Sequence, residues 1–505
     1  MRRPLLASAL LALAVPAALA APHATAAPAR LGTTPVLVRD AMAGMDTAVK
    51  NFAAVQSDTT IEPSIAVNPA NPKNVVVGYQ MGRVDAGGDA SNGYATTFDG
   101  GRTWKHGTIP GLTVKNGGDF QHASDAVVAF GPKNTVYFSS LVFNDDPNGL
   151  PAGPDRSAIV NSTSHDGGLT WDRPTAVIDD QAGGTNDKNW EVVDNGTGTG
   201  HHTGRLYVVW DRIAPVLASY SDDEGKTFSP PSVVYPGQGI GSIPLVLNDG
   251  SLGVVFLTDA APVPALHTNP GDELAEAIRG VSRIVMAISP AAGAVPAGAL
   301  PFSPPVTVGT WSGHQPRLQR ASSGLPTAGV DPKTGRIYVG WDDSRFRSEP
   351  SSPVNDPVIT WSDNAGVTWS PLKNLRVGGA NDYVDRFNSM LGIGPDGTLT
   401  VAYRQRQESA GPAGFSPFLD TYLLRSRDAG TTFSAPVRVN TVRADARFSA
   451  FSRSGSFWGD YNQLAVATDG TVYVVRCESY GVRKGEAAEF PPAVHHQRTW
   501  VAVVR

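Results

Sequence analysis

An eight-residue pattern, Ser/Thr-x-Asp-x-Gly-x-Thr-Trp/Phe, constrains the fold of this chain more than any other feature. Its five copies begin at Thr97, Ser164, Ser221, Ser362 and Ser426. The hydroxyl and carboxylate can bond to the backbone of a tight turn, and the Gly takes a conformation that other residues resist. The aromatic ring can pack into a neighbouring core. A fixed element that returns about every 60 residues indicates a repeat architecture.

Short β-branched and aromatic runs surround these turns and predict many strands joined by hairpins. We count seven units that start with a strand, a tight turn and a second strand, and the last of them runs from Asn462 to Val504. That last unit lacks an outer strand. The run Pro35–Val38 resembles the strand after each turn but has no turn before it. We therefore predict an all-β fold in which this N-terminal strand closes a ring.

The repeated turn is similar to the Asp-box of sialidases and related β-propeller proteins. The resemblance implies a β-propeller of four-stranded blades, with the boxes as structural turns away from the active-site mouth. Sialidases have six blades, whereas this chain has seven units. We expect seven blades, or six if one blade has been counted twice.

The first residues have the pattern of an export signal. Arg2 and Arg3 precede an apolar run from Leu5 to Leu19, and small residues then offer cleavage sites up to residue 27. We predict a signal peptide over 1–27, a lead-in with the closing strand over 28–60, and one propeller domain over 61–505. The mature protein is expected to be secreted and monomeric, without a membrane-spanning segment.

The charge balance excludes some partners. Lys and Arg number 41 against 46 Asp and Glu, and no basic cluster stands out, which argues against nucleic acid. The single cysteine, Cys477, lies in an apolar run and is expected to be buried and inert. His201-His202 has no third ligand nearby in sequence, so neither a metal nor a cofactor is predicted.

Charged and aromatic residues gather where the predicted strands begin or end, in a chain that is otherwise lightly charged. Loops held by a rigid scaffold often carry function, arginines suit carboxylate recognition, and paired carboxylates suit acid/base work on a glycosidic bond. The candidate substrate-binding residues are Glu62, Asp125, Arg317, Arg345, Arg386, Arg404 and Asp460. The alternative for groups such as Asp342-Asp343-Ser344-Arg345 is a strand-end salt bridge.

The family resemblance adds catalytic candidates. A sialidase has an acid/base Asp before its first box, where this chain has Asp85 and Asp89. It also has a tyrosine nucleophile with a glutamate partner, for which the candidates here are Tyr461 or Tyr403 with Glu191 or Glu478.

One motif departs from the family. The Arg-Ile-Pro of sialidases, whose Arg helps to hold the substrate carboxylate, is replaced by Ile61-Glu62-Pro63. Arg317, Arg345 and Arg404 are the candidates to rebuild an arginine cluster.

Two classes of function follow. The first is a secreted carbohydrate-active enzyme, a sialidase-like exo-glycosidase for terminal, acidic sugars, with a uronic-acid polysaccharide lyase as a variant that uses the same residues. The second is a non-catalytic propeller that binds a glycan or a protein on the same face, because a fold alone does not fix a function.

Overall fold

The computed structural model describes residues 35–47, 55–84, 87–145, 155–181, 185–258, 282–290, 298–321, 324–347, 354–379, 382–408, 416–452, 455–481 and 486–505. The predicted signal peptide lies outside these residues. Within them the chain forms mainly antiparallel sheets and short 3-10 turns but no α-helix, which confirms the all-β prediction. No helix in this part of the chain has the length and hydropathy needed to span a bilayer.

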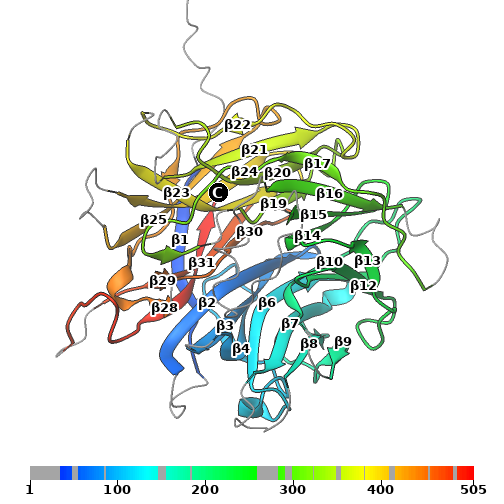
Figure 1. The fold of residues 1–505 in the computed structure, drawn as a ribbon, viewed down its shortest axis with the longest axis horizontal. Helices are drawn as coiled ribbons and strands as arrows, with labels where there is room; N and C mark the ends of the chain where they lie inside the picture. Colours follow the sequence, from blue (N-terminus) through cyan, green and yellow to red (C-terminus); the bar gives the residue numbers. More distant parts are fainter. Residues whose placement is uncertain are drawn as a thin grey trace, which may run out of the picture.

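The strands pair mainly with their sequence neighbours, in groups of four (Figure 1). The first group is β2 (Val55–Asn68), β3 (Asn71–Val84), β4 (Asp89–Thr97) and β5 (Lys105–Thr108). The second is β6 (His122–Phe130), β7 (Val136–Asn144), β8 (Arg156–Ser164) and β9 (Thr175–Asp180). The single pair Asp89–Ala123 joins these two groups into one sheet. The third is β10 (Asp187–Val193), β11 (Leu206–Asp211), β12 (Val216–Ser221) and β13 (Ser232–Tyr235).

The later groups repeat this order. The fourth is β14 (Ile240–Val246), β15 (Leu252–Thr258), β16 (Arg283–Ser289) and β17 (Val306–Thr310). The fifth is β19 (Thr327–Val330), β20 (Ile337–Asp343), β21 (Asp356–Ser362) and β22 (Lys373–Asn374). The sixth is β23 (Val384–Ile393), β24 (Leu399–Gln407), β25 (Phe418–Ser426) and β26 (Val437–Arg438), with β27 (Ala444–Asp445) also paired to β25.

The last group joins the two ends of the described chain. It contains β30 (Gln463–Val466), β31 (Val472–Ser479) and β32 (Gln497–Val504), and β1 (Leu37–Gly44) pairs antiparallel with β32. A small separate sheet contains β18 (Gln319–Arg320), β28 (Ala450–Ser452) and β29 (Gly455–Phe457). The predicted N-terminal strand thus adds to the C-terminal group, and it begins two residues later than the run Pro35–Val38.

The core lies between neighbouring groups. All six residues of β11 are buried, including Trp210, and all seven of β20 are buried, including Trp341. Both faces of these second strands are covered by other sheets, which explains why their sequences are nearly continuous apolar runs rather than alternating ones. Cys477 is buried as predicted, and burial raises its pKa to about 12.

The five repeated turns share one hydrogen-bond pattern. In the first copy the Thr97 hydroxyl accepts from Gly101 N at 3.1 Å, and Asp99 accepts from Thr103 N at 2.9 Å and from the Thr103 hydroxyl at 2.7 Å. Thr97 pairs with Val75, at the end of the group where β2 finishes. The turn therefore lies at the opposite end of its sheet from Glu62, near the start of β2.

Candidate active site

The first strands of five groups share a bulge near their start. The register shifts fall between Ile61 and Ser64, Ser124 and Val127, Asp187 and Trp190, Ile240 and Ile243, and Phe387 and Met390. Glu62, Asp125 and Asn388 lie within such bulges at φ values of 50°, 45° and 49°. This left-handed conformation costs a non-glycine residue about 1–2 kcal/mol. Strain at matching positions is typical of functional sites, where bulges re-aim side chains.

A central cavity of about 290 Å³ lies among these first strands. Its apolar lining includes Ile65, Val128, Ile243 and Leu391, which lie further along the strands. Its polar lining includes Lys188, Asp342, Asn388, Ser389, Asp460, Tyr461 and Asn462 from the strand starts, and also Glu191, Asn195, Thr327 and Gln463. The volume is at the lower end of the range for small-molecule sites, so it suits one small unit rather than a polymer.

Tyr461 and Asp125 form the central hydrogen bond of this site. The Tyr461 hydroxyl donates to Asp125 Oδ1 at 3.1 Å, and both residues are buried. Burial first, and then the charges of Asp125 and Glu62, raise the pKa of Tyr461 well above its ordinary value. Burial also raises the pKa of Asp125, against the charge of Lys188 and the hydrogen bond from Tyr461. The proton can move from the Tyr461 phenol to the Asp125 carboxylate when the phenol oxygen forms a bond to a substrate.

Lys188 carries its ammonium group between two aromatic rings. Nζ lies 3.9 Å from the ring centroid of Trp190 and 4.0 Å from that of Tyr461. Lys188 is 5% exposed, and Nζ has no hydrogen-bond partner among the described residues. Burial lowers its pKa, while Asp125 and Asp211 oppose that effect. A buried ammonium group on a cavity wall whose N–H donors have no partner can bind an anionic ligand.

Asp460 presents one carboxylate oxygen to the cavity wall. Its Oδ2 accepts from Arg320 at 2.6 Å, while the buried Oδ1 has no partner within the described residues. Glu62 fixes the backbone here, because Glu62 Oε1 accepts from Asp460 N at 2.8 Å and Oε2 accepts from Gln80. Burial, followed by the charges of Asp125 and Asp460, raises the pKa of Glu62 to about 8.

Two further carboxyl groups at this level join neighbouring sheets. Asp211, at the end of β11, accepts from Gly241 N at 2.6 Å and from the Ser242 hydroxyl in the next group. Asp342, at the end of β20, accepts in the same way from the Ser389 hydroxyl. Burial raises the pKa of Asp211 to about 8 and that of Asp342 to about 7.

The catalytic candidates from the sequence are only partly brought together. Asp85 lies outside the described residues. Asp89 is fully buried 3.7 Å from Arg83 and does not line the cavity. Tyr461 makes its hydrogen bond to Asp125 and not to Glu191 or Glu478. Glu191 lines the same cavity; it accepts from Asn161 of the neighbouring sheet at 2.7 Å, and its Oε1 has no partner among the described residues. Glu478 is held by Arg404 and Arg476, and Asp125 takes the predicted place of a glutamate.

The predicted arginine cluster is also not formed. Arg345 pairs with Asp343 at 2.8 Å, which is the strand-end salt bridge of the alternative prediction. Arg404 is buried against Glu478 at 3.1 Å, and Arg317 is exposed. Arg386 pairs with Asp356 and Asp382. Among the described residues that line the cavity there is no arginine, and Arg345, Arg386 and Arg404 are each paired with a carboxylate elsewhere in the fold.

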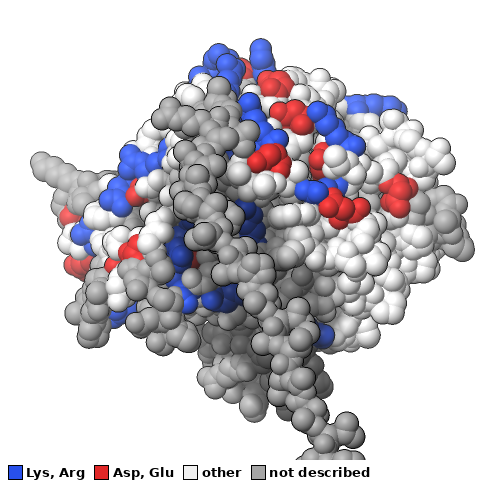
Figure 2. Space-filling model, turned by 90° about the horizontal axis from the view of Figure 1, so that it is seen from above, with Lys and Arg blue, Asp and Glu red and all other residues white. Residues whose placement is uncertain are grey.

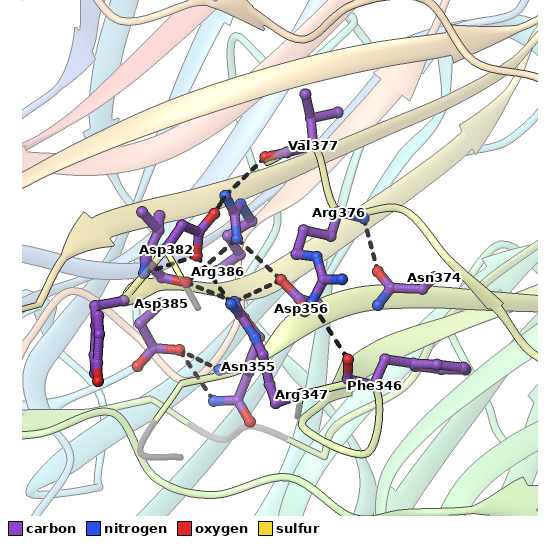
Figure 3. Close-up of polar contacts among 12 residues, drawn as sticks. Phe346, Arg347, Asn355, Asp356, Asn374, Arg376, Val377, Asp382, Asp385 and Arg386 are labelled. Atoms are coloured by element: carbon purple, nitrogen blue, oxygen red, sulfur yellow. Dashed lines mark hydrogen bonds and ion pairs between the residues drawn. The ribbon is translucent and has the colours of Figure 1, made fainter. Parts of the chain in front are cut away.

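Three arginines do meet elsewhere, around two aspartates. Asp356 accepts from Arg347 at 2.7 Å and from Arg386 at 3.0 Å, and it contacts Arg376 at 3.4 Å. Arg347 and Arg386 reach Asp382 as well (Figure 3). Asp356 is fully buried. In this network the arginines are paired with Asp356 and Asp382, so it holds together the chain segments that carry these residues.

Sequence reasoning missed Lys188 and Arg320 as site residues. Nothing in the sequence showed that two aromatic rings would enclose Lys188. Arg320 lies in the small separate sheet, in β18, and has no repeat pattern around it. The described residues contain no group of three His, Cys, Asp or Glu side chains placed to hold a metal ion.

Comparisons with known proteins show distant structural similarity only. No family model and no curated protein matches the chain. A protein of unknown function from Dyadobacter fermentans is similar over 93% of this chain and 99% of its own, at 12% identity and a TM-score of 0.47. An intramolecular trans-sialidase from Ruminococcus gnavus is similar over 69% and 90%, at 14% identity and a TM-score of 0.42. A polysaccharide lyase acting on ulvan is similar over 90% and 97%, at 11% identity and a TM-score of 0.47. Similarity at this level transfers neither a substrate nor a residue role.

Proposed function

We propose that this protein is a secreted, sialidase-like exo-glycosidase that takes one terminal, acidic sugar into the central cavity. The observation that carries the proposal is the Tyr461–Asp125 hydrogen bond of 3.1 Å beside the buried ammonium of Lys188. A phenol paired with a carboxylate is a nucleophile with its proton acceptor in place. The small cavity volume favours a chain end over an internal unit.

The unsatisfied polar atoms on the cavity wall match a sugar acid. Lys188 Nζ can neutralise the substrate carboxylate, and Asp460 Oδ1 can accept a hydrogen bond from a hydroxyl. The Asn462 amide can donate one hydrogen bond to the sugar and accept another. Tyr461 then bonds to the anomeric carbon as the glycosidic bond breaks. The phenol proton passes to Asp125. The leaving oxygen takes a proton from water, and the hydroxide that remains takes the proton from Asp125, which restores the carboxylate. A second water releases the sugar and restores the phenol.

We also infer that the groups of four strands are the blades of a seven-bladed β-propeller. The first strands contact one another in the cyclic order β2, β6, β10, β14, β19, β23, β30 and back to β2. Pairing of β1 with β32 supports closure of the ring by the N-terminus. In this arrangement the cavity lies on the propeller axis, the usual place for a propeller ligand. We propose a single domain over 61–505.

A uronic-acid lyase is the second candidate, and Lys188 favours it as well. A lyase must neutralise the substrate carboxylate before a proton can leave the neighbouring carbon, and the cavity offers one cation for that task. A nucleic-acid ligand has no such support, because the face in Figure 2 mixes basic and acidic side chains over its upper part.

The test is release of fluorophore from a sialoside, uronides and neutral glycosides by the mature protein, with an ultraviolet assay for unsaturated lyase products. Lys188→Met is expected to raise KM for the acidic substrate at least tenfold. A variant at an exposed lysine of the opposite end, Lys105→Met, is the matched control. Release of an unsaturated product alone selects the lyase. Glycan binding without turnover overturns the enzyme proposal in favour of a binding propeller.

A further inference from the structure

Tyr383 combines two features that a surface aromatic residue rarely has together. Its side chain is 40% exposed, and its φ of 49° places it in the left-handed region. For a bulky residue that conformation is an outlier, and a glycine or asparagine would adopt it at less cost. Tyr383 belongs to none of the hydrophobic core clusters formed by the described residues. Stability of the fold therefore does not explain why a tyrosine stands at this position.

The backbone on both sides of Tyr383 is clamped by the arginine network. Asp382, on one side, accepts from Arg347 at 2.9 Å and from Arg386 at 2.7 Å. The Val384 carbonyl, on the other side, accepts from Arg347 at 2.8 Å. Asp356 accepts from both guanidinium groups (Figure 3). The Tyr383 carbonyl itself accepts from the backbone N–H of Glu408 at 2.7 Å.

Such a network is costly to bury, since the desolvation of the charges offsets most of their attraction. Arg347, Arg386 and Asp356 are at most 3% exposed at their side chains. Their combined effect is to fix the backbone on both sides of one strained, partly exposed tyrosine. Strain that the surroundings enforce is typical of a ligand-contacting position.

The position of Tyr383 relates it to the central cavity. It directly precedes β23, and the same strand lines the cavity with Asn388, Ser389 and Leu391. Five residues of strand span roughly 17 Å. Tyr383 therefore lies at the mouth end of the ring but beyond the reach of the sugar that occupies the cavity.

We propose that Tyr383 is an aromatic platform for a second sugar ring, one that belongs to the glycan outside the cavity. A tyrosine ring offers an apolar face to the C–H side of a pyranose and a hydroxyl at its edge, which suits an amphipathic ligand. The inference rests on the proposed function and narrows its substrate class from glycosides in general to glycans of several units. The arginine network is then the positioning element of a distal subsite.

The experiment compares Tyr383→Gly and Tyr383→Trp in the full chain, with Phe98→Ala as control. Phe98 is 42% exposed but lies on the first repeated turn, at the other end of its sheet. KM and kcat are measured on a fluorogenic monosaccharide and on an oligosaccharide of four or more units ending in the same sugar. Gel retardation by polysialic acid, polygalacturonate and alginate gives a readout that needs no turnover.

Tyr383→Gly is expected to raise KM for the oligosaccharide about 3- to 10-fold, with the monosaccharide kinetics unchanged. Its Tm should equal or exceed that of the parent, because glycine relieves the backbone strain. Tyr383→Trp should retain oligosaccharide affinity. Equal behaviour of Tyr383→Gly and Phe98→Ala, or an equal loss on both substrates, overturns the platform.

The two proposals fail in different ways. Retardation that depends on Tyr383, in a protein without turnover on any substrate, leaves the platform standing and removes the glycosidase. Turnover on the oligosaccharide that is indifferent to Tyr383 leaves the glycosidase and removes the platform. Absence of both retardation and turnover on all probes overturns both.

Discussion

Tyr461 donates a hydrogen bond of 3.1 Å to Asp125 across a sequence separation of 336 residues. Asp125 lies in the bulge of β6, and Tyr461 precedes β30 in the group that contains both ends of the described chain. The site is thus assembled only when the last strands come to lie beside the first ones. This hydrogen bond therefore requires both parts of the chain to be folded.

Removal of the phenol oxygen tests this pair directly. Tyr461→Phe is expected to lower kcat by about 10²–10⁴, because the nucleophile and its proton transfer to Asp125 are lost together. Tyr79→Phe is the matched control, since Tyr79 is also buried but its hydroxyl bonds backbone carbonyls of Met45 and Tyr94. Equal kinetics for the two variants in a steady-state assay would contradict the assigned role.

The pH–rate profile should respond to Lys188. Asp125 accepts a proton only when ionised, so activity rises with pH through its elevated pKa. The charge of Lys188 lowers that pKa, so Lys188→Met is expected to move the acid limb of kcat/KM to higher pH. The pH–rate profiles of the parent and of Lys188→Met are measured on a neutral glycoside, so that the loss of binding to a charged substrate does not contribute. An unmoved acid limb would mean that another group sets it.

The free energy of unfolding should fall as the pH rises from 4 to 8 because of Asp211. Its pKa is 3.8 as a reference and about 8 in the folded protein. In this window the unfolded chain releases the proton and the folded chain keeps it, so the free energy of unfolding decreases as pH rises. Asp211→Asn is expected to flatten this slope in urea titrations across the range. A slope equal to that of the parent would show that the carboxyl group does not keep its proton.

Glu478 provides a contrasting case, a buried carboxylate with a structural role. It is held by Arg404 at 3.1 Å and Arg476 at 2.6 Å, and none of the three is exposed. Glu478→Gln leaves two buried cations undercompensated and is expected to cost about 3–5 kcal/mol of unfolding free energy. The kcat of the folded fraction should be unchanged. A large fall in kcat with little change in stability would restore Glu478 as a catalytic candidate.

Closure of the ring can be tested at β1. A chain that begins after Gly44 exposes the edge of β32 and leaves Arg476 without Asp40, its partner at 2.6 Å. We expect a lower Tm and association of the shortened protein, because an unpaired strand edge recruits other chains. Differential scanning calorimetry and sedimentation measure both effects. Unchanged values would show that β1 is dispensable for closure.

Much of the fold could be predicted from the sequence because its signals are local. The turn at Thr97 is specified by residues within eight positions of each other, and the apolar run of β11 reflects burial on both faces. The strand Pro35–Val38 was found by its likeness to other outer strands, and the described β1 does pair with the C-terminal β32.

The candidate site depended on tertiary structure, because its contacts join residues far apart in the chain. The sequence identified four residues of the site as candidates, namely Tyr461, Asp125, Glu62 and Asp460. It predicted a glutamate as the partner of Tyr461, whereas the hydrogen bond is made to Asp125. The sequence shows which residues carry charge, but not which neighbour each charge meets. Arg404 and Glu478 neutralise each other in the core, while Lys188 is enclosed by two rings on the cavity wall. Local pattern determined the turns and strands. Only the tertiary arrangement of the sheets decided which ionisable groups face one another, because that depends on distances no local pattern encodes.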